Sequence, residues 1–69
     1  MIKIHPDHVD NALGTIRKFG QFIGEIGDLR YYIVDGKLWC HSPLAGKVYR
    51  CDNPEEKEET VERIKRLAN

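Results

Sequence analysis

The sequence predicts a small α+β domain made of an N-terminal helix, a four-stranded antiparallel meander and a C-terminal amphipathic helix. Apolar residues recur at helical spacing near both ends of the chain, and turn sequences divide the region between them into short apolar runs. With 69 residues, 41% of them hydrophobic and 32% charged, the chain is expected to form one globular domain over residues 1–69.

The first helix is predicted to begin at Pro6, because proline is favoured in a first turn, and Asp7 supplies a cap or a first-turn acid. Gly20 favours a helix end. Helical spacing is kept by Val9, Ala12, Leu13, Ile16 and Phe19. Before this helix, Ile2 and Ile4 alternate with polar residues, which indicates either a short edge strand or a loose end.

Turn sequences separate the four predicted strands. Gly27-Asp28 and Asp35-Gly36 each stand between two apolar runs, and Asp-Gly in that position is a strong signal for a hairpin. A longer polar segment, residues 42–46, precedes the last strand. The predicted strands are residues 21–26, 29–34, 37–41 and 47–51.

The last helix is predicted from its capping residues. Asn53 stands at the cap, Pro54 at the first helical position and Glu56 at the third, which is a variant of the capping box. Acids fill the first turns and bases the last turns, as the helix dipole favours. One apolar stripe is formed by Val61, Ile64, Leu67 and Ala68.

Two-residue turns fix the register of the first two hairpins, so the sheet residues can be assigned to faces. The first face is apolar, and both helices are expected to cover it. It comprises Phe22, Gly24, Ile26, Leu29, Tyr31, Ile33, Leu38 and Cys40. The second face is mixed, with a cross-strand ion pair between Glu25 and Arg30.

The second face is the first candidate binding surface, because it places an aromatic and aliphatic row beside basic side chains. The candidate residues are Ile23, Arg30, Tyr32, Val34, Lys37, Trp39 and His41. Three alternatives stay open: N-terminal residues cover this face, a second copy covers it, or the register slips by one. In a homodimer built on this face, alanine at Trp39 or Tyr32 is expected to give a folded monomer.

The acidic start of the last helix is the second candidate surface, since it could engage a basic groove on a partner. Its residues are Asp52, Glu55, Glu56, Glu58, Glu59 and Glu62. The simpler interpretation of these acids is that they complement the helix dipole and aid solubility.

The two cysteines are interpreted as small buried residues of neighbouring strands. A two-residue turn at Ala45-Gly46 would place Cys40 opposite Cys51, within disulfide range. A longer loop would instead place Cys40 opposite Tyr49 and Cys51 opposite Leu38. A zinc site is a weaker alternative, because its donor types are present without zinc-site spacing. Its ligands would be His5, His8, Cys40 and Cys51.

Catalysis is the least favoured class, and no cofactor is expected. Ser42 follows His41, but neighbouring residues of a strand point to opposite faces, so they do not form a nucleophile–base pair. The glycines of residues 20–27 lack the lysine of a phosphate-binding loop.

A protein is the favoured partner. The 11 basic and 11 acidic residues leave no net charge to attract nucleic acid. Nucleic acid is the second hypothesis, with bases stacking on Tyr32 and Trp39. No run is long enough for a membrane span, and no signal peptide is recognised, so a cytoplasmic protein is expected. We predict a non-enzymatic inhibitor or adaptor, such as a phage-type inhibitor of a nucleic-acid enzyme.

Overall fold

The computed structural model describes residues 1–68 and confirms the α+β class. Its elements are β1 (Ile2–Lys3), a short 3₁₀ helix (Pro6–His8), α1 (Val9–Phe19), β2 (Gln21–Ile26), β3 (Leu29–Val34), β4 (Lys37–Ser42), β5 (Lys47–Cys51) and α2 (Pro54–Ala68). The strands form one antiparallel sheet in the order β1-β5-β4-β3-β2. The sheet therefore has five strands instead of four, because the N-terminal segment pairs with β5.

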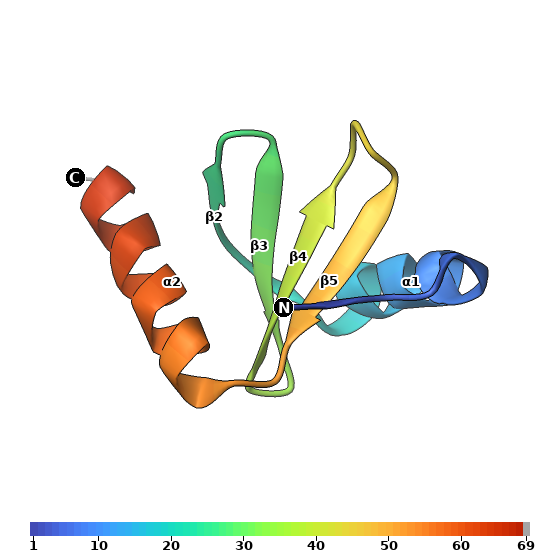
Figure 1. The fold of residues 1–69 in the computed structure, drawn as a ribbon, viewed down its shortest axis with the longest axis horizontal. Coiled ribbons are helices and arrows are strands. Elements are labelled where there is room, and N and C mark those ends of the chain that lie inside the picture. The colour runs from blue at the N-terminus through green and yellow to red at the C-terminus, as the bar shows by residue number, and fades with distance from the viewer. Residues whose placement is uncertain (69) are drawn as a thin grey trace.

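The two helices lie on opposite faces of the sheet, so the expectation that both cover one face is wrong. In Figure 1, α2 lies on one side of the strands and α1 on the other. The physical reason is that both faces carry apolar side chains. Val34 and Val48 on the second face are buried, and each needs a covering layer. The segment that covers them is α1, as one of the alternatives for this face anticipated.

The first core lies between α2 and the first face. Ile64 of α2 packs there against four buried sheet residues, which are Tyr31, Leu38, Cys40 and Cys51. Leu38 and Cys40 are 0% exposed, so the predicted first face is confirmed at its centre. At the start of α2, the amides of Glu55 and Glu56 donate hydrogen bonds to Asn53 Oδ1 at 2.9 and 3.3 Å, as the capping sequence predicts.

The second core lies between α1 and the second face. Ala12 and Ile16 of α1 pack against Val34 of β3 and Val48 of β5. Tyr32 and Trp39 are half-buried at the margin of this core. Truncating either ring would remove core contacts, so alanine at these positions is expected to destabilise the domain and cannot report on oligomerisation alone.

The hairpin between β3 and β4 has the predicted register, with Val34 opposite Lys37 and Tyr32 opposite Trp39. Its turn residues, Asp35 and Gly36, both have positive φ, at 50° and 76°. Positive φ at both central positions is the geometry that an Asp-Gly hairpin turn requires.

The hairpin between β2 and β3 departs from the predicted register at a β-bulge. Pairing is as predicted from Ile26 to Gly24, but the register then shifts between Phe22 and Gly24. Phe22 therefore lies opposite Tyr32 on the second face, and Ile23 packs against the first core instead. The bulge coincides with a close approach of α2, because a Cβ atom at Gly24 would lie 2.5 Å from Ile64 Cγ2.

Replacing Gly24 with alanine should lower the free energy of unfolding by about 1–3 kcal/mol, through overpacking against Ile64 and strain at φ +150°. Gly14 is the matched control, since a Cβ atom there would meet nothing within 4 Å. Gly14→Ala should be stabilising by about 0.5–1 kcal/mol, because it lies inside a helix. Urea unfolding of both variants measures the difference. Equal effects would show that the sheet and α2 do not meet closely at Gly24.

Candidate docking groove

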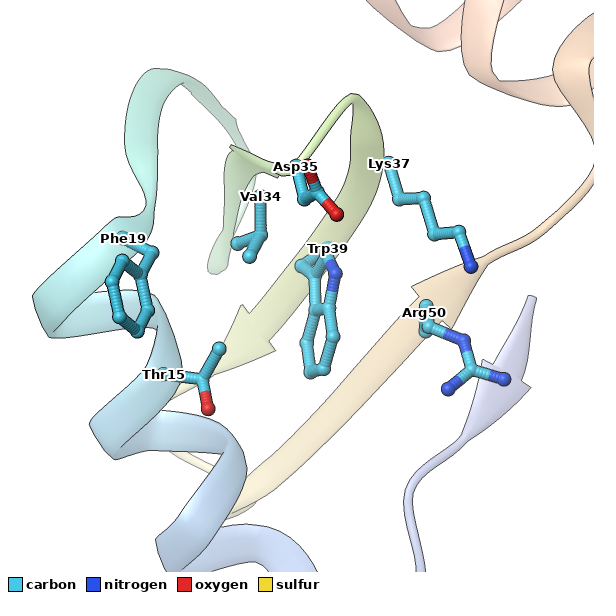
Figure 2. Close-up of a pocket in the computed structure, with 7 residues that line it drawn as sticks. All are labelled: Thr15, Phe19, Val34, Asp35, Lys37, Trp39 and Arg50. Carbon is cyan, nitrogen blue, oxygen red and sulfur yellow. The ribbon is translucent and has the colours of Figure 1, made fainter.

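The second face is only partly covered, and a groove remains beside α1. Its volume is about 610 Å³. α1, the end of β3 with its turn, β4 and β5 all contribute side chains to it (Figure 2). The lining residues are Thr15, Phe19, Val34, Asp35, Lys37, Trp39 and Arg50. We call this feature the α1 groove.

Aromatic side chains form the apolar part of the α1 groove. The Trp39 indole lies between the helix residues Thr15 and Phe19 on one side and Arg50 on the other (Figure 2). Phe19 is 66% exposed at the C-terminal end of α1. Val34 also lines the groove, and it is buried in the second core. The Phe19 and Trp39 rings therefore expose apolar surface to water beside a residue that the core holds in place.

Cationic groups form one wall of the α1 groove. Arg50 binds Asp52 through two hydrogen bonds, from Nε at 2.8 Å and from Nη2 at 2.9 Å. These bonds, together with the charge of Arg50 and then of Lys37, hold the pKa of Asp52 below its usual value. The ion pairs found among residues 1–68 include neither Lys37 nor Asp35.

The structure divides the predicted sheet-face residues among three places. Val34, Lys37 and Trp39 line the α1 groove. Arg30, Tyr32 and His41 are on the same face but outside the groove. Ile23 is on the opposite face because of the bulge, so its assignment to this surface is wrong.

Sequence reasoning missed Thr15, Phe19, Asp35 and Arg50 as groove residues. Phe19 follows the apolar spacing of α1, which predicts burial, and Asp35 is explained by the turn. Arg50 could have been placed beside Trp39 from the sequence, because the longer-loop register of the last hairpin puts these two residues opposite each other. The structure has this pairing. The sequence left open that N-terminal residues cover this face, but it did not indicate which side chains of α1 would lie beside Trp39 and Arg50.

A second group of aromatic and basic side chains lies outside the groove. The rings of Phe22 and Tyr32 are 5.5 Å apart between centroids, and the Arg30 guanidinium lies 5.3 Å from the centre of the Phe22 ring. Glu25 forms the predicted ion pair with Arg30, at 3.2 Å. The Phe22 ring therefore already contacts an aromatic ring, that of Tyr32, and a cation, the Arg30 guanidinium.

The predicted acidic surface divides into two parts. Asp52 is bound to Arg50, and Glu56 is half-buried. The remaining acids are spaced three and four residues apart, so they share the solvent-facing side of α2. They are Glu55, Glu58, Glu59 and Glu62. Side chains of a single helix line this surface, so no second element encloses a ligand there.

The last hairpin adopts the longer-loop register, with Cys40 opposite Tyr49 and Cys51 opposite Leu38. Both cysteines are free and buried in the first core. The Cys51 thiol donates to Asn53 O at 3.3 Å, and burial raises the pKa of the Cys40 thiol. Neither disulfide pairing nor direct opposition of the two residues occurs.

The four residues of the zinc alternative do not come together. Cys40 and Cys51 belong to the first core, whereas His5 caps and His8 ends the 3₁₀ helix that leads into α1. His5 Nδ1 accepts a hydrogen bond from the Asp7 amide at 3.1 Å. Across residues 1–68, no group of three or more His, Cys, Asp or Glu side chains is arranged to hold a metal ion.

No family model, no curated protein sequence and no solved structure matches this chain. In the described part of the chain, neither helix is long and apolar enough to cross a membrane. The side chains of the α1 groove and their surroundings are therefore the features that bear on function.

Both thiols should react slowly in the native protein, because Cys40 is 0% and Cys51 3% exposed. A chromogenic thiol reagent at neutral pH should label them at a rate limited by opening of the fold, and at once in denaturant. Intact mass without reductant should correspond to two thiols. Rapid labelling under native conditions would contradict the burial of this pair.

His41 should titrate below 6.5, because burial, Arg30 and Arg17 all lower its pKa. The unfolded chain then binds more protons at pH values just below 6.5, so this histidine makes the fold less stable as the pH falls through that window. NMR titration should show the His41 pKa rising in Arg17→Gln. Lys18→Gln is the control, since it removes the same charge from the next residue. An unchanged pKa in Arg17→Gln would contradict this assignment.

Proposed function

We propose that this protein is a non-enzymatic protein-binding domain that docks a partner protein in the α1 groove. In this role it would act as an inhibitor or adaptor by occupying a surface of its partner. The observation that carries the proposal is that Phe19, which is 66% exposed, lines the same cavity as Trp39. Tryptophan and arginine are the residue types most enriched at the energetic centres of protein interfaces.

The rigidity of the groove supports a docking role. Val34 is fixed in the second core, and Trp39 is held between Tyr32 and Arg50 by the register of the sheet. Arg50 is in turn held by two hydrogen bonds to Asp52. Side chains that are ordered before binding lose less conformational entropy when the partner arrives, which favours affinity.

The chemistry of the lining supports binding over catalysis. The groove residues include no cysteine, serine or histidine, and the Thr15 hydroxyl donates to Asn11 O of its own helix at 3.1 Å. A nucleophile activated by an adjacent base is therefore not part of this lining.

Nucleic acid is less well supported as a ligand than protein. Tyr32 is half-buried under α1, and the Phe22 ring contacts Tyr32 and Arg30 already. The charge of Arg30 is also compensated by Glu25. A phosphate backbone would therefore meet little uncompensated positive charge, and few unoccupied aromatic rings, around Phe22 and Tyr32.

Phe19→Ala should weaken binding of the partner by at least about 30-fold, the effect of losing an interface anchor of about 2 kcal/mol. Folding should be nearly unaffected, because Phe19 is mostly exposed. Phe22→Ala is the matched control, since Phe22 is a half-exposed aromatic residue outside the groove. Immobilised wild type and both variants would be exposed to nuclease-treated lysate, and recovered proteins quantified by mass spectrometry.

Support requires a protein that is lost with Phe19→Ala, retained with Phe22→Ala, and able to change the emission of Trp39 when purified. Trp39 is the only tryptophan of the chain, so its fluorescence reports on the groove. Equal recovery on all three baits would contradict the proposal. Recovery only without nuclease would favour nucleic acid, and concentration-dependent self-association that Phe19→Ala abolishes would assign the groove to a second copy.

A further inference from the structure

The charges around the α1 groove are unevenly placed. Lys37 and Trp39 are two residues apart on β4, and Arg50 lies opposite Trp39 on β5, so all three side chains are on the second face. The two cations therefore stand side by side along one wall of the apolar floor, as Figure 2 shows. We call Lys37 and Arg50 the cationic wall.

The cationic wall keeps donors available for a ligand. A guanidinium has five N–H groups, and Asp52 uses only one on Nε and one on Nη2 of Arg50. The Lys37 ammonium forms no ion pair within the described chain, residues 1–68. One bound carboxylate thus faces two cations, and the wall retains a net positive charge.

Asp35 restricts where a negative group could bind. It lies in the β3–β4 turn, away from Arg50 in Figure 2, and it has no ion-pair partner among residues 1–68. A carboxylate would be repelled near Asp35 and attracted between Lys37 and Arg50. The apolar group of the same ligand would then lie between Phe19 and Trp39.

From this arrangement we infer that the α1 groove recognises a partner segment in which a large apolar side chain has a carboxylate beside it. This inference rests on the proposed function and names the chemistry of the partner. The apolar side chain supplies the anchor, and the carboxylate accepts charge-assisted hydrogen bonds from the cationic wall. A segment with a basic residue at that position would be rejected by like-charge repulsion.

A displayed library of random peptides tests the inference. Selection on wild type, with Phe19→Ala for counter-selection, should enrich peptides that carry Phe, Tyr, Trp or Leu near Asp or Glu. Enriched peptides would then be titrated individually while Trp39 emission is followed. Lys37→Glu should weaken them by at least about tenfold, and added salt should reduce their affinity. Lys37→Gln, which removes the charge without reversing it, should give a smaller loss.

A charge swap gives the sharpest comparison. Peptides whose acid is replaced by lysine should bind Lys37→Glu better than they bind wild type. Lys47→Glu is the matched control, because Lys47 is an exposed strand lysine outside the groove, and it should leave affinity unchanged. Circular dichroism would establish that every variant is folded.

The outcomes separate the two proposals. Peptides that need Phe19 but carry no acid, or that are indifferent to Lys37→Glu, would overturn the inference and leave the docking function standing. Failure to enrich any peptide over the Phe19→Ala counter-selection would overturn both.

Discussion

The fold depends on the burial of both faces of its central strands. In β3, Tyr31 and Val34 are buried on opposite faces, and Leu38 of β4 and Val48 of β5 are each 0% exposed beneath different helices. Alternating side chains make one layer insufficient for such strands. A 69-residue chain can bury only a limited area and has two α-helices for two apolar faces. Each helix therefore covers one face.

This division leaves the second face incompletely covered. α1 has 11 residues and buries only Ala12 and Ile16 fully, while the sheet beneath it extends to Lys37 and Arg50. Trp39 lies at the edge of the covered part, and its ring is only half-buried against the second core. The groove is thus a consequence of the size of α1, and its floor is rigid because the core beneath it is shared.

Charge is distributed differently on the two sides of the domain. The exposed acids of α2 lie on the solvent-facing side of a single helix, where they are solvated and those in the first turn complement the helix dipole. Lys37 and Arg50 stand beside apolar rings in a concave surface, where partial removal from water strengthens electrostatic interactions. The balanced overall charge therefore gives no indication of the proposed docking groove, where two cations lie beside apolar rings.

The sequence by itself determined both α-helices, four of the five strands and most of their pairing. Capping at Asn53, the Asp35-Gly36 turn and the apolar spacing of α1 act over a few residues, so each could be recognised locally. The faces of β3 and β4 followed from the turn alone. Three groove residues, Val34, Lys37 and Trp39, were accessible to the same reasoning.

Only the tertiary structure decided which face each helix covers, where the β2 strand bulges and which side chains meet at the groove. These features depend on contacts between residues far apart in the chain, such as Gly24 with Ile64 and Ile16 with Val34. Shape and volume at such contacts select among arrangements that the local pattern permits equally, since the same apolar stripe can pack on either face of a sheet.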